Sequence, residues 1–163
     1  MSNYRRAQVP GGCFFFTVVT QNRKPWLTDS NPIHRLRRAF REVMRQRPFA
    51  IDAVVILPDH LHTIWRLPPG DDDFSTRWRL IKHNVTTGQD WRWQPRFWEH
   101  CLRDEEDWRR HIEYIHYNPV KHGYAKTPWD WPFGSFRHAV DRGWHSKDWG
   151  TMPPEGLPTE AGE

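Results

Sequence analysis

The amino-acid sequence predicts an α+β fold in which one antiparallel sheet packs against helices. Short apolar runs rich in β-branched and aromatic residues alternate with longer segments of helical periodicity. The two-residue link Pro58-Asp59 joins two of these runs, and so short a link requires antiparallel neighbours. The chain has 163 residues, which is the size of one domain with a substantial core.

The first half of the chain predicts a strand, a helix and two further strands. The strands are residues 13–20, 49–57 and 60–67, which are mainly apolar. The helix begins at Asn31-Pro32, because proline suits the first helical position, and it ends before Pro48. Its buried side is an apolar stripe at helical spacing, formed by Ile33, Leu36, Phe40, Val43 and Met44.

The second half predicts a helix, a strand and one more helix. Ser75 is the expected N-cap of the first helix, whose apolar stripe is Trp78, Ile81 and Val85. Residues 96–102 are the fourth strand. Asp104 caps the last helix, and Pro119 is expected to stop it. The order is therefore βαββαβ, a ferredoxin-like antiparallel sheet, followed by an additional helix.

Residues 1–149 are predicted to form a single domain. After Gly123 the chain is rich in Trp, Pro and Gly, which indicates an ordered but irregular C-terminal extension, and residues 150–163 are expected to be a disordered tail. The net charge of +4 weakly favours a polyanionic partner. The sequence contains neither a signal peptide nor a run of roughly 20 apolar residues, so a cytoplasmic location is expected.

The candidate metal motif is His60-Leu61-His62. Side chains alternate along a strand, so both imidazoles share one face, about 7 Å apart, while Leu61 anchors the other face. Two histidines are only two ligands, and a third side chain, water or a phosphate oxygen must complete the set around a divalent ion. The alternative is a chance His-x-His pair that forms ordinary hydrogen bonds.

The candidate nucleophile is Tyr114, on the last helix. Trp108, Ile112 and Ile115 form its apolar stripe, Tyr114 and Asn118 share one flank of that stripe, and Tyr117 lies opposite. A tyrosine, with an ordinary pKa of about 10, attacks a phosphodiester when a metal polarises the phosphate and basic groups stabilise the phenolate. The alternative makes both tyrosines amphipathic residues at a helix edge.

Several stretches between Tyr4 and about Trp149 together resemble the REP-associated tyrosine transposases, a branch of the single-tyrosine HUH transposases. The metal motif and the tyrosine helix are among them, in the family's order. The matching stretches are residues 4–6, 11–17, 57–62, 78–82, 94–100, 114–123 and 130–133.

The resemblance implies a function and a site. His60 and His62 match the HUH metal ligands, Tyr114 matches the catalytic tyrosine, and Asn118 matches the polar residue that assists metal binding. Family members use Mg²⁺ or Mn²⁺ to cut single-stranded DNA at REP hairpins flanked by a guide tetranucleotide, and they keep the 5′-phosphate on tyrosine. Resemblance to this branch implies a monomer in which Tyr114 acts in cis, whereas related insertion-sequence enzymes are dimers. A bacterial, nucleoid-associated enzyme follows.

DNA contacts are expected from basic side chains near the strand ends and the last two predicted helices. Trp91, Trp93 and Trp98 are candidates for stacking on unpaired bases, and for Trp98 packing in the core is favoured. The basic candidates are Arg5, Arg6, Arg23, Lys24, Arg77, Arg79, Lys82, Arg96 and Lys121.

Two other functions compete with transposition. A metal-dependent phosphoesterase that activates water would use the same histidines and would not need Tyr114. A DNA-binding module that has lost catalysis would bind hairpins without metal and cut nothing. The expected catalytic residues are all present in the sequence, which disfavours the second alternative.

Overall fold

The computed structural model describes residues 9–163, and its strands form one antiparallel sheet in the order β2-β3-β1-β4. This order is that of a ferredoxin-like βαββαβ unit, so the predicted fold class is confirmed. The short fourth strand lies inside the predicted range 96–102. The strands are β1 (Cys13–Val19), β2 (Ala50–Ile56), β3 (His60–Arg66) and β4 (Trp98–Cys101).

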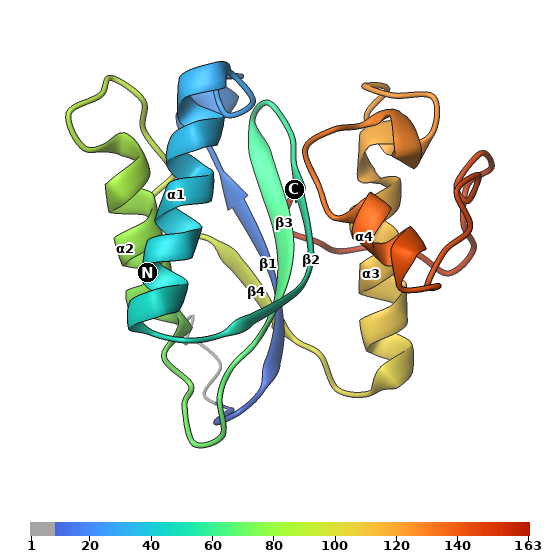
Figure 1. Ribbon diagram of the computed structural model, residues 1–163, viewed down its shortest axis with the longest axis horizontal. Helices are drawn as coiled ribbons and strands as arrows, with labels where there is room; N and C mark the ends of the chain where they lie inside the picture. The colour runs from blue at the N-terminus through green and yellow to red at the C-terminus, as the bar shows by residue number, and fades with distance from the viewer. Residues whose placement is uncertain (1–8) are drawn as a thin grey trace.

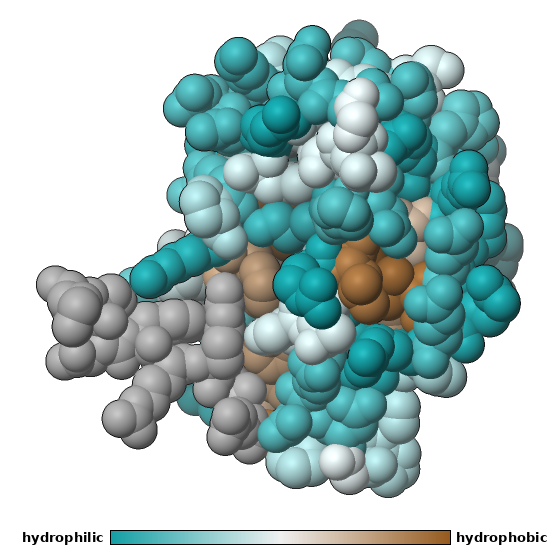
Figure 2. Space-filling model, turned by 90° about the vertical axis from the view of Figure 1, so that its left-hand side faces the viewer, coloured by the Kyte–Doolittle hydropathy of each residue, from teal (hydrophilic) through white to brown (hydrophobic). Residues whose placement is uncertain are grey.

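Helices cover both faces of the sheet (Figure 1). On one face lie α1 (Ser30–Gln46) and α2 (Phe74–Thr86), and on the other lies α3 (Glu105–Lys121). Seen from the side of α1 and α2, the surface is mostly hydrophilic, with apolar side chains gathered in small areas (Figure 2). The shorter helices are η1 (Gln21–Arg23), η2 (Pro128–Asp130) and α4 (Phe136–Asp141).

The two faces of the sheet have separate cores, which follow from the alternation of β3. Leu61 and Trp65 point toward α1 and α2, where the Trp65 ring stacks on Trp78 with centroids 4.3 Å apart. Ile64 points toward α3 and packs with Ile112 and Ile115. The even-numbered side chains of β3, including both histidines of the motif, therefore lie on the α3 face.

Three helix boundaries differ from the prediction. α1 begins at Ser30 and not at Asn31-Pro32, so Pro32 lies at its third position. The N-cap of α2 is Asp73 and not Ser75, because the Asp73 carboxylate accepts a hydrogen bond from the Thr76 backbone N–H at 3.0 Å. Pro119 does not stop α3, which continues to Lys121. Proline removes only one N–H donor near the end of this helix, and Gly123, with φ +76°, turns the chain. Asp104 caps α3 as predicted.

The C-terminal extension covers the outer edge of β2. Gly134 forms a bridge with Val55, and the Ile56 N–H donates to the Phe133 carbonyl at 2.8 Å. Pairing protects an edge that would otherwise expose unpaired backbone groups. The disorder expected for residues 150–163 stays a prediction; in the structure this segment has no helix or strand, and it runs back over the sheet toward β3.

Among residues 9–163, no helix combines the length and the apolar character that a membrane crossing requires.

Candidate active site

His60 and His62 lie side by side on β3, next to the central strand β1. Their ring centroids are 4.9 Å apart, and both side chains are almost completely buried. Register places His60 opposite Val19 and His62 opposite Thr17 on β1. The prediction that both imidazoles share one face of a strand is confirmed by this geometry.

Hydrogen bonding orients the His60 ring. Its Nδ1 donates to the Asp59 carboxylate at 2.6 Å, which leaves Nε2 with a lone pair. That Nε2 is buried and has no hydrogen-bond partner among the described residues. Burial opposes ionisation of Asp59, yet hydrogen bonds from His60 and Arg23 outweigh it and lower the Asp59 pKa. A carboxylate behind the imidazole is the usual support of a metal-binding histidine.

Two residues of β1 fix the orientation of the His62 ring. Its Nδ1 lies 2.7 Å from the Thr17 hydroxyl, and its ring stacks on Phe15 with centroids 5.4 Å apart. Burial lowers the His62 pKa to about 4, so the ring is neutral at physiological pH and its nitrogens can bind a cation.

Tyr114 and Asn118 project from α3 toward these histidines. The Tyr114 ring lies 5.2 Å from the His62 ring, edge to face. Asn118 is fully buried, and its Oδ1 has no hydrogen-bond partner within residues 9–163. Tyr117, by contrast, is half-buried against the extension near Gly150. The helical pattern therefore selected the tyrosine that borders the histidines.

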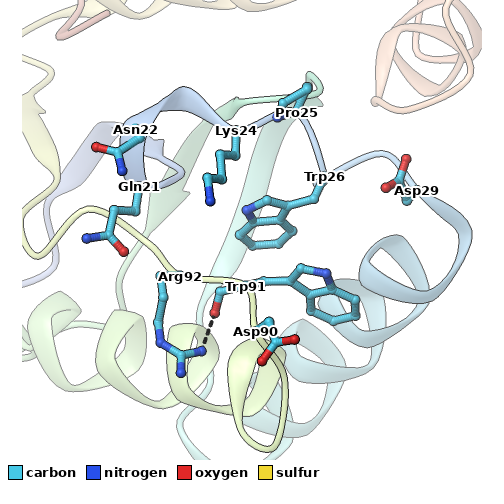
Figure 3. A pocket seen from close by; sticks show the side chains of 9 residues that line it. All are labelled: Gln21, Asn22, Lys24, Pro25, Trp26, Asp29, Asp90, Trp91 and Arg92. Atoms are coloured by element: carbon cyan, nitrogen blue, oxygen red, sulfur yellow. Dashed lines mark hydrogen bonds between the residues drawn. The ribbon is translucent and has the colours of Figure 1, made fainter.

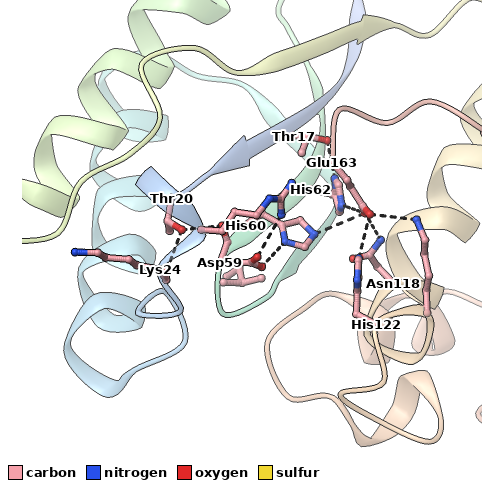
Figure 4. Close-up of polar contacts among 12 residues, drawn as sticks. Thr17, Thr20, Lys24, Asp59, His60, His62, Asn118, His122 and Glu163 are labelled. Atoms are coloured by element: carbon pink, nitrogen blue, oxygen red, sulfur yellow. Dashed lines mark hydrogen bonds and ion pairs between the residues drawn. The ribbon is translucent and has the colours of Figure 1, made fainter.

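The side chain of Glu163 lies in the middle of this group (Figure 4). Its Oε1 is 2.7 Å from His62 Nε2 and 3.6 Å from His60 Nε2, and it accepts hydrogen bonds from Asn118 Nδ2, at 2.8 Å, and from the Tyr114 hydroxyl. Its Oε2 lies 3.1 Å from both Lys121 Nζ and His122 Nε2. One oxygen position is thus within reach of all four predicted site residues.

The donor set fits a divalent metal. Two histidine nitrogens converge within 4.8 Å of a carboxylate oxygen, and the buried His60 Nε2 and Asn118 Oδ1 lack any other partner among described residues. Imidazole nitrogen, amide oxygen and carboxylate oxygen together suit Mn²⁺, and the oxygen donors suit Mg²⁺.

Lys121 and Glu163 have opposite effects on the ionisation of Tyr114. Burial, followed by the hydrogen bond to Glu163 and its negative charge, raises the Tyr114 pKa. Lys121 Nζ lies 3.1 Å from the Tyr114 hydroxyl and 4.8 Å from its ring centre, where its charge favours the phenolate. The Tyr114 phenolate would therefore form more easily without the Glu163 carboxylate beside it.

Sequence reasoning missed three members of the site. The sequence marks Asp59 only as a residue of a turn, His122 only as part of a stretch that resembles the family, and Glu163 only as part of the tail. Asp59 had a signal, since it directly precedes His60. Nothing local marked Glu163, because 101 residues separate it from His62.

A second group of side chains of the kinds that bind metals lies at the start of α3, where their hydrogen bonds stabilise the fold. His100 Nε2 donates to the Asp107 carboxylate at 2.9 Å, and His111 Nδ1 donates to the Asp107 carbonyl at 2.7 Å. Arg103 adds a backbone hydrogen bond to the same carboxylate. These hydrogen bonds tie β4 to α3.

The expected DNA contacts separate into distinct groups. Arg5 and Arg6 lie outside the described residues. Arg77 is a correction: it is 2% exposed, and its guanidinium binds Asp71 together with backbone carbonyls of Arg47, Pro48 and Asp73, so it holds the structure together. Lys121 lies in the site itself.

Of the other basic candidates, Arg23 pairs with Asp59 at 3.2 Å, and Lys82 donates to the Gln94 carbonyl at 2.8 Å. Lys24, Arg79 and Arg96 are exposed. Trp98 is also a correction, because it is 37% exposed and not a core residue; the short edge strand β4 leaves one side of it open, and Gly162 lies against it.

Comparison with known proteins agrees with this geometry. No family model matches the chain. A REP-associated tyrosine transposase of Escherichia coli K12 is 51% identical over 151 residues, 91% of each chain. A relative from Haemophilus influenzae is 41% identical over 170 residues, 94% of this chain and 96% of its own. The solved structure of a REP-associated tyrosine transposase bound to a REP hairpin has 49% identity and a TM-score of 0.91, covering 100% of this chain and 98% of that one.

The fold and these comparisons thus define a tyrosine transposase, an enzyme that acts on DNA, and in this chain a helix-borne tyrosine lies beside a histidine pair. Within that class, the chain belongs to the REP-associated tyrosine transposases.

Proposed function

We propose that this enzyme cleaves and rejoins single-stranded DNA at REP-type hairpins through a 5′-phosphotyrosine intermediate on Tyr114. One observation carries the proposal. A single oxygen, Glu163 Oε1, lies against both the histidine pair and the Tyr114 hydroxyl, so a phosphate oxygen in that place would meet the metal ligands and the nucleophile together.

His60, His62 and Asn118 would hold Mg²⁺ or Mn²⁺. The bound ion would supply charge that polarises the scissile phosphate. Asp59 keeps His60 Nε2 free for this purpose, and Thr17 orients His62.

The protein's own groups account for the chemical step. The Tyr114 oxygen forms a bond to phosphorus while the bond from phosphorus to the 3′-oxygen breaks; the phenol proton passes to solvent, and the 3′-oxygen takes up a proton. Lys121 stabilises the phenolate with its positive charge, and Lys121 Nζ and His122 Nε2 lie where they can donate hydrogen bonds to a non-bridging phosphate oxygen. Rejoining is the reverse, with the 3′-hydroxyl attacking the phosphotyrosine.

We also propose that the enzyme works as a monomer with Tyr114 in cis, on DNA in the cytoplasm and in association with the nucleoid. The support for a monomer is that β3 and α3 of one chain bring all four site residues together. The hairpin substrate is supported by the related structure bound to a REP hairpin.

The test is a covalent adduct assay. An end-labelled single strand carrying a REP hairpin is incubated with protein and Mn²⁺ or Mg²⁺, and the expected product is a protein-DNA adduct that survives denaturation. Tyr114→Phe should abolish it, while Tyr117→Phe should retain it. Cleavage without any adduct, or undiminished cleavage by Tyr114→Phe, would support the water-activating phosphoesterase; metal-independent binding without any cutting would support the binding module.

A further inference from the structure

A hollow of about 380 Å³ lies beyond the C-terminal end of β1, away from the active site. It forms between η1 with the segment after it, residues 21–29, and the loop of residues 90–92 that follows α2 (Figure 3). Its size is that of a small-ligand site.

The floor of the hollow is a pair of stacked indoles. Trp26 and Trp91 lie with ring centroids 5.6 Å apart and planes inclined by 16°. Trp26 is buried and further fixed by the edge of Trp93, whereas Trp91 is only half-buried. A rigid aromatic surface that remains partly open is suited to stacking on a flat ring.

Unpaired polar side chains surround these indoles. Gln21 and Lys24 line one end, and Asp29 lies at the opposite end with Asp90 below (Figure 3). None of these four side chains forms a hydrogen bond or an ion pair with another residue in the range 9–163. A cation and an amide at one end and carboxylates at the other would complement a ligand that carries an anionic group beside hydrogen-bond donors.

The hollow is connected to the active site through one strained turn. Asn22 and Arg23 both have positive φ, at 56° and 52°, a conformation that costs free energy for residues other than glycine. Arg23 binds Asp59, which binds His60. Thr20 ties both sides together by donating to the carbonyls of Lys24 and Asp59, and Figure 4 shows this link.

We infer that this hollow binds one unpaired nucleotide of the DNA strand that the active site cuts, an inference that rests on the proposed function. The base stacks on Trp91, and its sugar-phosphate lies toward Lys24 and Arg92. Asp29 and Asp90 would repel phosphate, so they meet the base edge and accept from an exocyclic amine. Thymine, which has no such amine, is the least favoured base.

Binding without metal tests this inference independently of cleavage. Fluorescence anisotropy in EDTA would compare a hairpin that carries a single-stranded flank with the same hairpin lacking it, for wild type, Trp91→Ala and Gln21→Ala. Loss of one base stack should weaken binding of the flanked hairpin by about 5- to 150-fold in Trp91→Ala. Binding of the hairpin without a flank should not change. Trp144→Ala, which removes a partly exposed indole of the extension, is the control.

An abasic scan locates the nucleotide. Removing one base at a time from the flank should weaken wild-type binding strongly at a single position, and Trp91→Ala should show no further loss at that position. Equal affinity of Trp91→Ala and wild type for the flanked hairpin would overturn the inference. So would an equal loss with the hairpin lacking a flank, which would assign the hollow to the stem. If wild type shows this pattern yet forms no adduct with metal, the proposed nuclease fails and the nucleotide site stands.

Discussion

Glu163→Gln is expected to increase DNA cleavage, because in the proposed mechanism the carboxylate occupies the position that the scissile phosphate would take. The Glu163 side chain is 17% exposed, and its two carboxylate oxygens contact Tyr114, Asn118, His62, Lys121 and His122. A hydrogen bond to a charged group contributes about 1.5–3 kcal/mol, and each 1.4 kcal/mol is a factor of ten. Loss of one such hydrogen bond would raise the equilibrium constant for release of the tail, in which residue 163 leaves the site, by roughly 10- to 100-fold.

The assay is the initial rate of adduct formation on a labelled hairpin strand with Mn²⁺, together with Mn²⁺ binding followed by electron paramagnetic resonance. Adduct formation should rise by up to about the same 10- to 100-fold factor, because it follows the population of the open site. Glu160→Gln, an exposed carboxylate in the same segment, is the matched control. An unchanged adduct rate would refute the reasoning. Weaker Mn²⁺ binding with slower cleavage would show instead that Glu163 is a metal ligand.

Three further predictions concern the tail, acid stability and a buried arginine. Gly162→Ala should mimic Glu163→Gln, since an added Cβ would lie 2.3 Å from Trp98 atoms at φ +72°, whereas Gly156→Ala, with φ +72° and open space, should not. Burial lowers the His116 pKa to about 3, whereas the imidazole in the unfolded chain has its ordinary pKa of about 6.5, so as the pH falls the unfolded state takes up this proton before the folded state does. The free energy of unfolding, measured with urea, should therefore decrease from about pH 6.5 down toward pH 3, and it should decrease less in His116→Asn. Arg77→Ala should lower the free energy of unfolding by about 3 kcal/mol, because it leaves a buried network unpaired, and an unchanged urea midpoint would contradict this.

The strand pattern and the placement of the candidate site residues could be predicted from the sequence because each depends on local periodicity. Period-two alternation on β3 was sufficient to place His60 and His62 together, and the helical wheel was sufficient to choose Tyr114. Both are properties of a single element, so no knowledge of the tertiary packing was needed.

The residues whose surroundings the sequence does not predict depend on contacts between distant segments. From the sequence alone, Arg77 is expected to be an exposed charge. It is buried because residues 47–48 and 71–73 fold against it and accept its hydrogen bonds. Glu163 meets His62 across 101 residues of sequence, and no periodicity carries that information. Pro119 was misjudged for another reason: its helix had almost ended, so the missing N–H cost little.

The contacts of Glu163 indicate which step its removal should accelerate. Asn118 presents its Nδ2 donor to the carboxylate, so Oδ1, the atom that a metal requires, points elsewhere. The Tyr114 hydroxyl is also engaged as a donor, and burial, together with the hydrogen bond to Glu163 and its negative charge, raises the Tyr114 pKa. Lys121 and His122, whose nitrogens suit a phosphate, are engaged by the other carboxylate oxygen. In the proposed mechanism, a phosphate entering this position would therefore have to replace the carboxylate before Tyr114, the Asn118 amide oxygen and the Lys121 and His122 nitrogens become available together. Because all three depend on the same displacement, tail release should change the rate of adduct formation more than it changes the affinity for DNA bound elsewhere on the surface.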